Sequence, residues 1–101
     1  MSRNFLSGLQ TNGLIVGAVI KTAPYTANTS DIIILANGTF TVTLPTPVGA
    51  TGRFYTVKNT GTGTVTVATT AGTIDGGATA VITVQYSSID VVSDGTNWNI
   101  I

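Results

Sequence analysis

The sequence predicts a single all-β domain, folded as an antiparallel β-sandwich or a barrel-like module. From Gly13 onward the chain is a series of short runs rich in Val, Ile, Thr, Tyr and Phe, which suit a pleated, half-buried surface. Gly, Asn, Asp and Pro separate these runs at close to the spacing of about 8–12 residues that is typical of sandwiches and barrels. No stretch has the three-and-four apolar spacing of an amphipathic helix, and Glu, Gln, Lys and Leu are scarce or absent.

The first strands are predicted from apolar runs. Leu14–Lys21 is continuously apolar up to its lysine, and Ala23–Tyr25 extends it past the break at Pro24. Asp31–Ala36 carries four consecutive large aliphatic residues, so it is apolar on both faces. A strand with that pattern is expected to be buried on both sides.

A hairpin is expected directly after Asp31–Ala36. Asn37-Gly38 is a strong short-range hairpin signal because both residues tolerate positive φ. Thr39–Leu44 then alternates, with threonines on one face and Phe40, Val42 and Leu44 on the other.

The C-terminal half continues the same pattern. Turns are expected at Thr60–Gly63 and at Asp94-Gly95, and Ile82, Val84 and Tyr86 should share one apolar face. The predicted strands are Arg53–Asn59, Thr64–Thr69, a short Thr73–Asp75, Ala80–Tyr86, Ile89–Ser93 and Asn97–Ile101. Two strand faces consist largely of threonine, and these either face solvent or meet equivalent faces of other copies.

The composition favours self-association. Only 8% of the residues are charged against 43% hydrophobic, whereas an ordinary soluble domain carries about 25% charged residues. The net charge is zero, and a surface with few charges tends to associate. We therefore expect residues 13–101 to form one β domain that packs against copies of itself, with residues 1–12 as a separate, flexible N-terminal segment.

Composition also argues against two classes of partner. The chain has no block of basic residues to contact a phosphate backbone, so nucleic acid is not expected. The longest apolar stretch, Gly13–Ile20, is far shorter than the roughly 20 residues that span a bilayer, so no membrane insertion is expected.

No catalytic centre or cofactor site is predicted. The chain has no His, Glu or Cys, which removes the usual general bases, the triad base and the ligands of zinc. Asp31, Asp75 and Asp94 lie at strand starts and turns, where their carboxylates are expected to accept hydrogen bonds from nearby backbone N–H groups. A weak calcium site across an oligomer axis is the one metal alternative left open.

The aromatic residues divide into two groups. Phe40, Tyr86 and Trp98 fall on apolar strand faces and are expected in the core. The remaining candidates could face a ligand such as a sugar ring, and they are Tyr25, Phe54 and Tyr55.

The stretch from Thr39 to Ile101 resembles a module that recurs in fibre and virion-surface proteins of tailed bacteriophages. The upstream Asp31–Leu35 run also fits the resemblance, which covers roughly two-thirds of the chain. Its motifs are Phe40-Thr41-Val42-Thr43-Leu44-Pro45, Gly49-Ala50-Thr51-Gly52-Arg53-Phe54-Tyr55-Thr56-Val57-Lys58-Asn59, Thr73-Ile74-Asp75-Gly76 and Ser93-Asp94-Gly95-Thr96-Asn97-Trp98.

The resemblance implies a β-rich module that forms an intimate homotrimer on the virion surface, after assembly in the host cytoplasm, and it brings no catalytic residues. Because the module fills nearly the whole chain, we expect a capsid decoration (cement) protein or a short head fibre that binds the major capsid protein or another virion protein. The alternative is a receptor- or carbohydrate-binding module of a tail fibre, which would bind a host-surface glycan. The residues expected to attach the protein to the capsid are Arg3, Phe5, Leu6 and Leu9.

Overall fold

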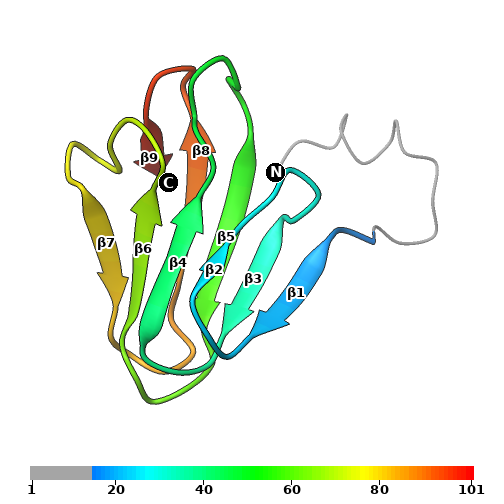
Figure 1. Ribbon diagram of the computed structural model, residues 1–101, viewed down its shortest axis with the longest axis vertical. Helices are drawn as coiled ribbons and strands as arrows, with labels where there is room; N and C mark the ends of the chain where they lie inside the picture. Colours follow the sequence, from blue (N-terminus) through cyan, green and yellow to red (C-terminus); the bar gives the residue numbers. More distant parts are fainter. Residues whose placement is uncertain (1–14) are drawn as a thin grey trace.

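The computed structural model describes residues 15–101, which form two β-sheets and no helix (Figure 1). Sheet A contains, in spatial order, β1 (Ala18–Lys21), β3 (Ile33–Ala36), β5 (Phe54–Asn59), β8 (Ser88–Ser93) and β9 (Trp98–Ile100). Sheet B contains β2 (Tyr25–Thr26), β4 (Phe40–Leu44), β6 (Val65–Thr69) and β7 (Thr79–Ile82). The predicted all-β class is confirmed, and the two sheets make a sandwich-like fold.

The chain alternates between the two sheets for its first six strands, as a coil does (Figure 1). As a result β1, β3 and β5 run parallel in sheet A, and β2, β4 and β6 run parallel in sheet B. Among the strands of residues 15–101, only the β5–β8, β6–β7 and β8–β9 pairs are antiparallel. The prediction of an antiparallel sandwich is therefore wrong for the N-terminal half, where each new strand pairs with the strand two positions earlier.

The predicted hairpin at Asn37-Gly38 is also wrong. This turn joins β3 in sheet A to β4 in sheet B, so it carries the chain across the core between strands that do not pair. The Asn-Gly pair allows a sharp turn but does not decide whether the two flanking strands then pair. At Asp94-Gly95 a predicted turn does join paired strands: it connects β8 to β9, and the Asp94 N–H donates to the carbonyl of Asn97 at 3.1 Å.

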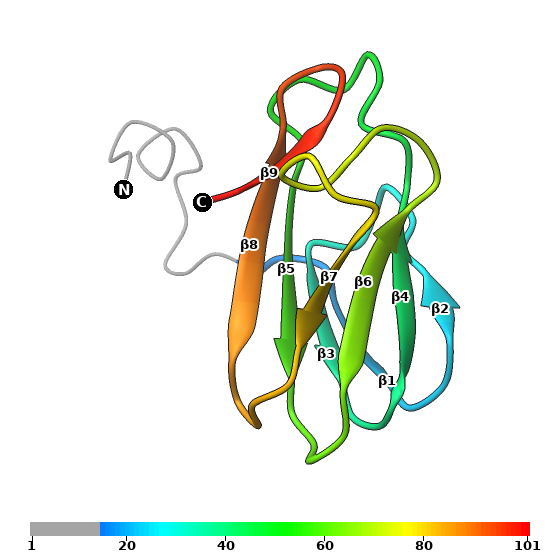
Figure 2. The ribbon, with the colours of Figure 1, turned by 90° about the vertical axis from the view of Figure 1, so that its left-hand side faces the viewer.

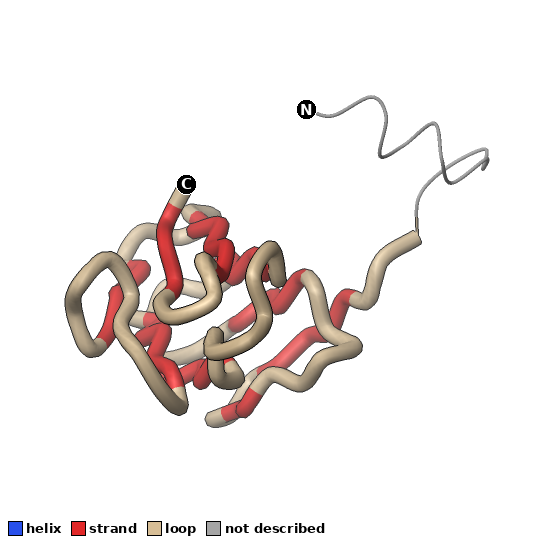
Figure 3. Tube along the Cα trace, turned by 90° about the horizontal axis from the view of Figure 1, so that it is seen from above, coloured by secondary structure: helices blue, strands red, loops and turns tan. Residues whose placement is uncertain are grey.

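The inner faces of both sheets form one core. Figure 2 shows the two sheets from the side, and Figure 3 shows them from above. Trp98 of sheet A is 1% exposed, and its ring meets that of Tyr55 edge-on, with centroids 5.5 Å apart. The Trp98 indole N–H donates to the carbonyl of Pro45 and to the hydroxyl of Thr69, so one side chain ties sheet A to the ends of β4 and β6. The predicted burial of Phe40 and Trp98 is confirmed.

Tyr86 is an exception to the predicted core. Strand β7 ends at Ile82, which is buried, whereas Val84 and Tyr86 are 63% and 65% exposed. Tyr86 has a φ of 68°, and the Ser87 N–H donates to the carbonyl of Val84, so residues 84–87 form a turn. The prediction that Tyr86 lies in the core is wrong because the extended backbone stops before it.

Gly17 shows how closely the first turn of the coil packs. Its carbonyl accepts hydrogen bonds from the N–H groups of Ile32 and Ile33, at 2.8 and 2.9 Å. A Cβ at this position would overlap the carbonyl oxygen of Ser30. Only glycine therefore allows residue 17 to lie directly against the start of β3.

The far edge of sheet A is covered by a segment that was predicted as a short strand, Thr73–Asp75. Its backbone accepts a hydrogen bond from the Trp98 N–H and donates one to the Trp98 carbonyl, at 2.8 and 3.0 Å. The Asp75 carboxylate accepts the N–H of Ile100 at 2.9 Å. The segment makes only an isolated bridge rather than a strand, but it occupies the outer edge of β9.

In the part of the chain that the structure describes, no helix is long and apolar enough to cross a membrane.

Candidate functional site

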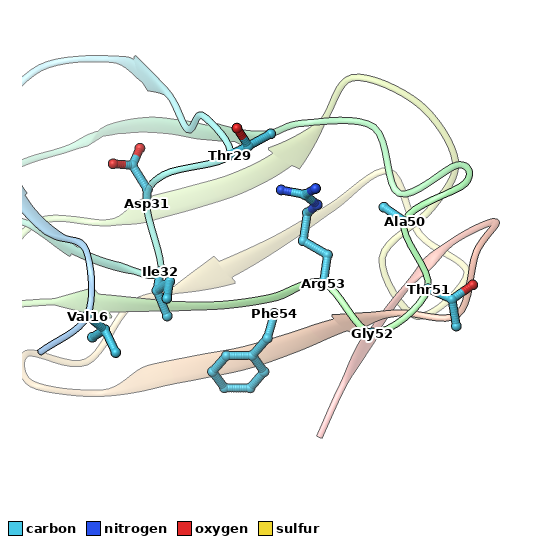
Figure 4. Close-up of a pocket in the computed structure, with 9 residues that line it drawn as sticks. All are labelled: Val16, Thr29, Asp31, Ile32, Ala50, Thr51, Gly52, Arg53 and Phe54. Atoms are coloured by element: carbon cyan, nitrogen blue, oxygen red, sulfur yellow. The ribbon is translucent and has the colours of Figure 1, made fainter. Parts of the chain in front are cut away.

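A pocket of about 700 Å³ opens beside the N-terminal ends of β3 and β5 (Figure 4). The loop before β3 provides one wall, and the loop before β5 provides the other. This volume lies in the range of about 300–1,000 Å³ that is usual for small-ligand sites. The lining residues are Val16, Thr29, Asp31, Ile32, Ala50, Thr51, Gly52, Arg53 and Phe54.

Asp31 is the acidic residue of the pocket, and it is held by local hydrogen bonds. Its Oδ2 accepts the hydroxyl of Tyr25 at 2.5 Å and the backbone N–H of Asn28 at 3.1 Å. Asp31 is 6% exposed, so these two bonds stabilise a carboxylate that lies mostly out of water. The hydrogen bond to Asp31, with burial, raises the pKa of Tyr25 above its ordinary value of 10.0.

Arg53 is the basic residue of the pocket. In Figure 4 its guanidinium extends toward Thr29, whereas the ring of Phe54 is directed to the opposite side of β5. This divergence follows from the alternation of side chains along an extended backbone. The residues that line the pocket thus lie on two sides of the β5 backbone, with the guanidinium on one side and Phe54, which also belongs to the outer surface of sheet A, on the other.

The pocket offers binding chemistry. A guanidinium presents several N–H donors in a plane and pairs well with carboxylates and other oxygen-rich groups. Thr29 and Asp31 add a hydroxyl and a hydrogen-bond acceptor. These groups suit a polar ligand with several oxygen atoms.

The three predicted ligand-facing aromatics lie in different environments. Phe54 is 38% exposed, as that prediction requires. Tyr25 is half-buried, its hydroxyl is engaged by Asp31, and the Lys21 ammonium lies 4.2 Å from its ring centroid. Tyr55 is fully buried and donates its hydroxyl to the carbonyl of Asn28, so the prediction that it faces a ligand is wrong. Phe54, the residue before Tyr55 on β5, points outward instead.

The predicted attachment residues Arg3, Phe5, Leu6 and Leu9 lie outside the described residues. Sequence reasoning did not place Asp31 and Arg53 at a ligand site. Both are isolated charged residues in a chain with only 8% charged residues, and this rarity is the feature of the sequence that could have indicated a site.

A second candidate site is the outward surface of sheet A, which we call the sheet A outer face. Ile20 is 75% exposed there, and Ile33 and Leu35 are half-exposed. Large aliphatic side chains thus gather on the β1–β3 side of this surface. Its residues are Ala18, Ile20, Ile33, Leu35, Phe54, Thr56, Lys58, Ser88, Asp90, Val92 and Asn99.

The outward surface of sheet B, which we call the threonine face, has a different character. It carries no charged residue, and Val81, 58% exposed, is its large hydrophobic side chain. Threonine hydroxyls can hydrogen-bond to water, so this surface is compatible with solvent as it stands. Its residues are Thr26, Thr41, Thr43, Thr66, Ala68, Thr79 and Val81.

The remaining aspartates shape the backbone. Asp94 accepts the N–H groups of Thr96 and Asn97, as predicted for a turn residue. The hydrogen bonds from Asn97, the Asn99 side chain and Thr96 lower the pKa of Asp94 below its ordinary value of 3.8. Asp75 instead accepts the distant N–H of Ile100. Within residues 15–101 no three acidic, His or Cys side chains cluster in a way that could hold a metal ion.

Comparisons with protein families, with curated proteins and with solved structures find no match to this chain.

Proposed function

We propose that this chain is a non-enzymatic structural protein of a tailed-bacteriophage virion, which self-associates as a homotrimer and binds the capsid as a decoration or head-fibre protein. The observation that carries the self-association is the sheet A outer face, where Ile20 and Phe54 are exposed and Leu35 is half-buried in a chain with only 8% charged residues. An exposed apolar surface of this kind marks an interaction site. The virion location and the trimer rest on the sequence resemblance described above.

The mass of the protein in solution tests the first part of the proposal. Light scattering behind size exclusion, over a range of concentrations, should give a species near three times 10.3 kDa. A monomer at every concentration would contradict the proposal, because the apolar face would then be stable in water without a partner.

Capsid binding tests the second part. Removal of residues 1–12 should abolish co-sedimentation of the protein with purified capsids and leave the trimer intact, since the β domain begins after this segment. A second variant replaces Arg3, Phe5, Leu6 and Leu9 by serine in the full-length chain and should likewise lose co-sedimentation with capsids. Unchanged binding by both variants would show that another part of the chain contacts the shell.

The pocket favours a second candidate function, a receptor- or carbohydrate-binding module of a tail fibre. The Arg53 guanidinium, together with Thr29 and Asp31, which also line the pocket, provides donors and acceptors that suit a saccharide. On a glycan array, Arg53→Ala should abolish a signal that Val81→Ala leaves unchanged, since Val81 lies outside the pocket on the outward surface of sheet B. The absence of any glycan signal from the wild-type protein would exclude this function at the pocket.

A further inference from the structure

Strand β3 is apolar on both faces, yet the described chain fully covers only one of them. Ile34 and Ala36 are fully buried between the sheets, whereas Ile33 and Leu35 point outward and are half-exposed. The sequence pattern of β3 is that of a strand covered on both sides. A partner from outside residues 15–101 would complete the cover of this outer face.

The strand register places the outward apolar residues side by side in two groups, one on β1 and β3 and the other on β5 and β8. Ile20 of β1 lies beside Leu35 of β3, and Ala18 lies beside Ile33. Further along the sheet, Phe54 of β5 lies beside Val92 of β8. The apolar surface therefore comprises residues of several strands and is not a single exposed side chain.

The charges on this surface are of opposite sign and lie close to each other. Lys58 and Asp90 are the charged members of the sheet A outer face, on the neighbouring strands β5 and β8. Asp90 pairs with Thr56, two residues before Lys58, and its carboxylate accepts the Thr56 hydroxyl at 2.7 Å. The Lys58 ammonium lies 5.7 Å from the ring centroid of Tyr86.

A surface that carries one positive and one negative group is complementary to a second copy of itself. A partner with a strong net charge would leave one of the two groups facing a like charge, whereas a second copy can offer Asp90 to Lys58. We propose that the sheet A outer face is the surface through which copies of this chain pack, with Lys58 of one copy next to Asp90 of its neighbour. The proposal rests on the self-association stated above, and it adds which face is buried and which pair sets the orientation. The threonine face stays in solvent.

Matched aspartate variants on the two outer faces test the choice of face. Ile20→Asp places a charge beside Leu35 on the edge strand β1 of the apolar surface, and Val81→Asp places the same charge on an exposed strand position of the threonine face. Ile20→Asp should reduce the mass measured by light scattering to that of the monomer, and Val81→Asp should leave the assembly unchanged. Far-UV circular dichroism on each variant verifies that the β fold is retained.

The outcomes separate the two proposals. Loss of assembly in Val81→Asp with retention in Ile20→Asp would overturn the choice of face and leave self-association standing. A wild-type protein that is monomeric at all concentrations would overturn both.

A charge exchange tests the proposed pair. Lys58→Asp alone sets two carboxylates against each other across the interface and should weaken association by about tenfold or more. The double variant Lys58→Asp with Asp90→Lys restores opposite charges and should recover association. If the single variant associates like the wild type, or if the double variant does not recover, Lys58 and Asp90 do not meet between copies.

Discussion

The two sheets of this molecule share one core but present different surfaces outward. On their inner faces both use Val, Ile, Leu and aromatic residues, and the two sets pack together around Trp98 and Tyr55. On its outer face sheet B carries mostly threonine and no charge, whereas sheet A carries Ile20, Leu35 and Phe54. The same β scaffold can therefore support a surface that water can hydrate and a surface that needs a partner.

The difference shows which features of a charge-poor composition bear on association. A surface with few charges need not expose hydrophobic groups, because the outer face of sheet B consists mainly of hydroxyl side chains that hydrogen-bond to water. Sheet A carries aliphatic side chains on its outer face beside Lys58 and Asp90, and full burial stabilises a fully exposed side chain of this size by about 1.5–3 kcal/mol. The tendency to associate is thus concentrated on one side of the molecule.

The largest effect is expected from the side chain that joins the sheets. Trp98→Ala should lower the free energy of unfolding by about 3–5 kcal/mol, because it removes a buried ring that contacts Tyr55 and bonds to Pro45 and Thr69. Urea unfolding followed by circular dichroism measures this loss. Trp98→Phe keeps a ring without the N–H and should cost less. If amide exchange then accelerates in sheet A alone, the sheets do not share one cooperative core.

A smaller effect should distinguish the two outer faces. Leu35→Thr gives sheet A an outward residue of the sheet B type and should destabilise the assembled protein by about 1–2 kcal/mol per protomer. Thr43→Val makes the opposite exchange on the threonine face and should change stability by no more than about 0.5 kcal/mol. Thermal unfolding at several protein concentrations measures both, since assembly makes the midpoint concentration-dependent. Equal effects of the two exchanges would remove the distinction between the faces.

The hydrogen bond between Tyr25 and Asp31 links the start of sheet B to the pocket. Tyr25→Phe removes one of the two donors to the Asp31 Oδ2 and should cost about 1 kcal/mol at neutral pH. The exposed Tyr86 provides the control, and Tyr86→Phe should have little effect on unfolding in urea. A Tyr25→Phe protein as stable as the wild type would mean that Asn28 alone suffices to hold the carboxylate.

The smallest effect should appear at acid pH and in sheet A. Since the folded pKa of Asp94 is lowered, its contribution to stability is present above the ordinary value of 3.8 and is lost as the pH falls through the folded pKa. In the Asp94→Asn variant the free energy of unfolding should therefore fall less steeply as the pH is lowered through this range. The strands of sheet B contain no acidic residue, so amide exchange in acid should accelerate first near the β8–β9 turn. A pH profile of the variant that matches the wild type would contradict this role of Asp94.

Strand positions could be predicted from the sequence because alternation and turn residues are local signals. Thr39–Leu44 was expected and β4 occupies Phe40–Leu44 with its apolar residues buried, as the pattern indicates. The direction of pairing could not be predicted, because a strand with one buried face has the same alternation in a parallel and in an antiparallel sheet. The turn after Ile82 was missed for a related reason, since residues 83–86 contain no Gly, Pro, Asn or Asp to indicate it.

The candidate sites were less accessible to sequence reasoning. The choice between Phe54 and Tyr55 depends on which face of β5 meets sheet B, and their order in the chain does not contain that information. The pocket is formed by residues from the loops before β3 and before β5, and only the coil topology brings these loops together. The apolar character of β3 on both faces was visible in the sequence, and it became informative once one face proved to be uncovered.

The segment that covers the outer edge of β9 sets a limit on polymerisation. Open strand edges are the usual route by which β proteins extend into fibrils, and a coil of parallel strands could in principle continue from one molecule into the next. In sheet A this route ends at β9, because the N–H groups of Trp98 and Ile100 already donate to Thr73 and Asp75. An incoming strand would have to displace both hydrogen bonds before sheet A could grow at that end. A chain with so few charges to keep copies apart can therefore assemble through its faces while being protected, at this edge, from unlimited growth.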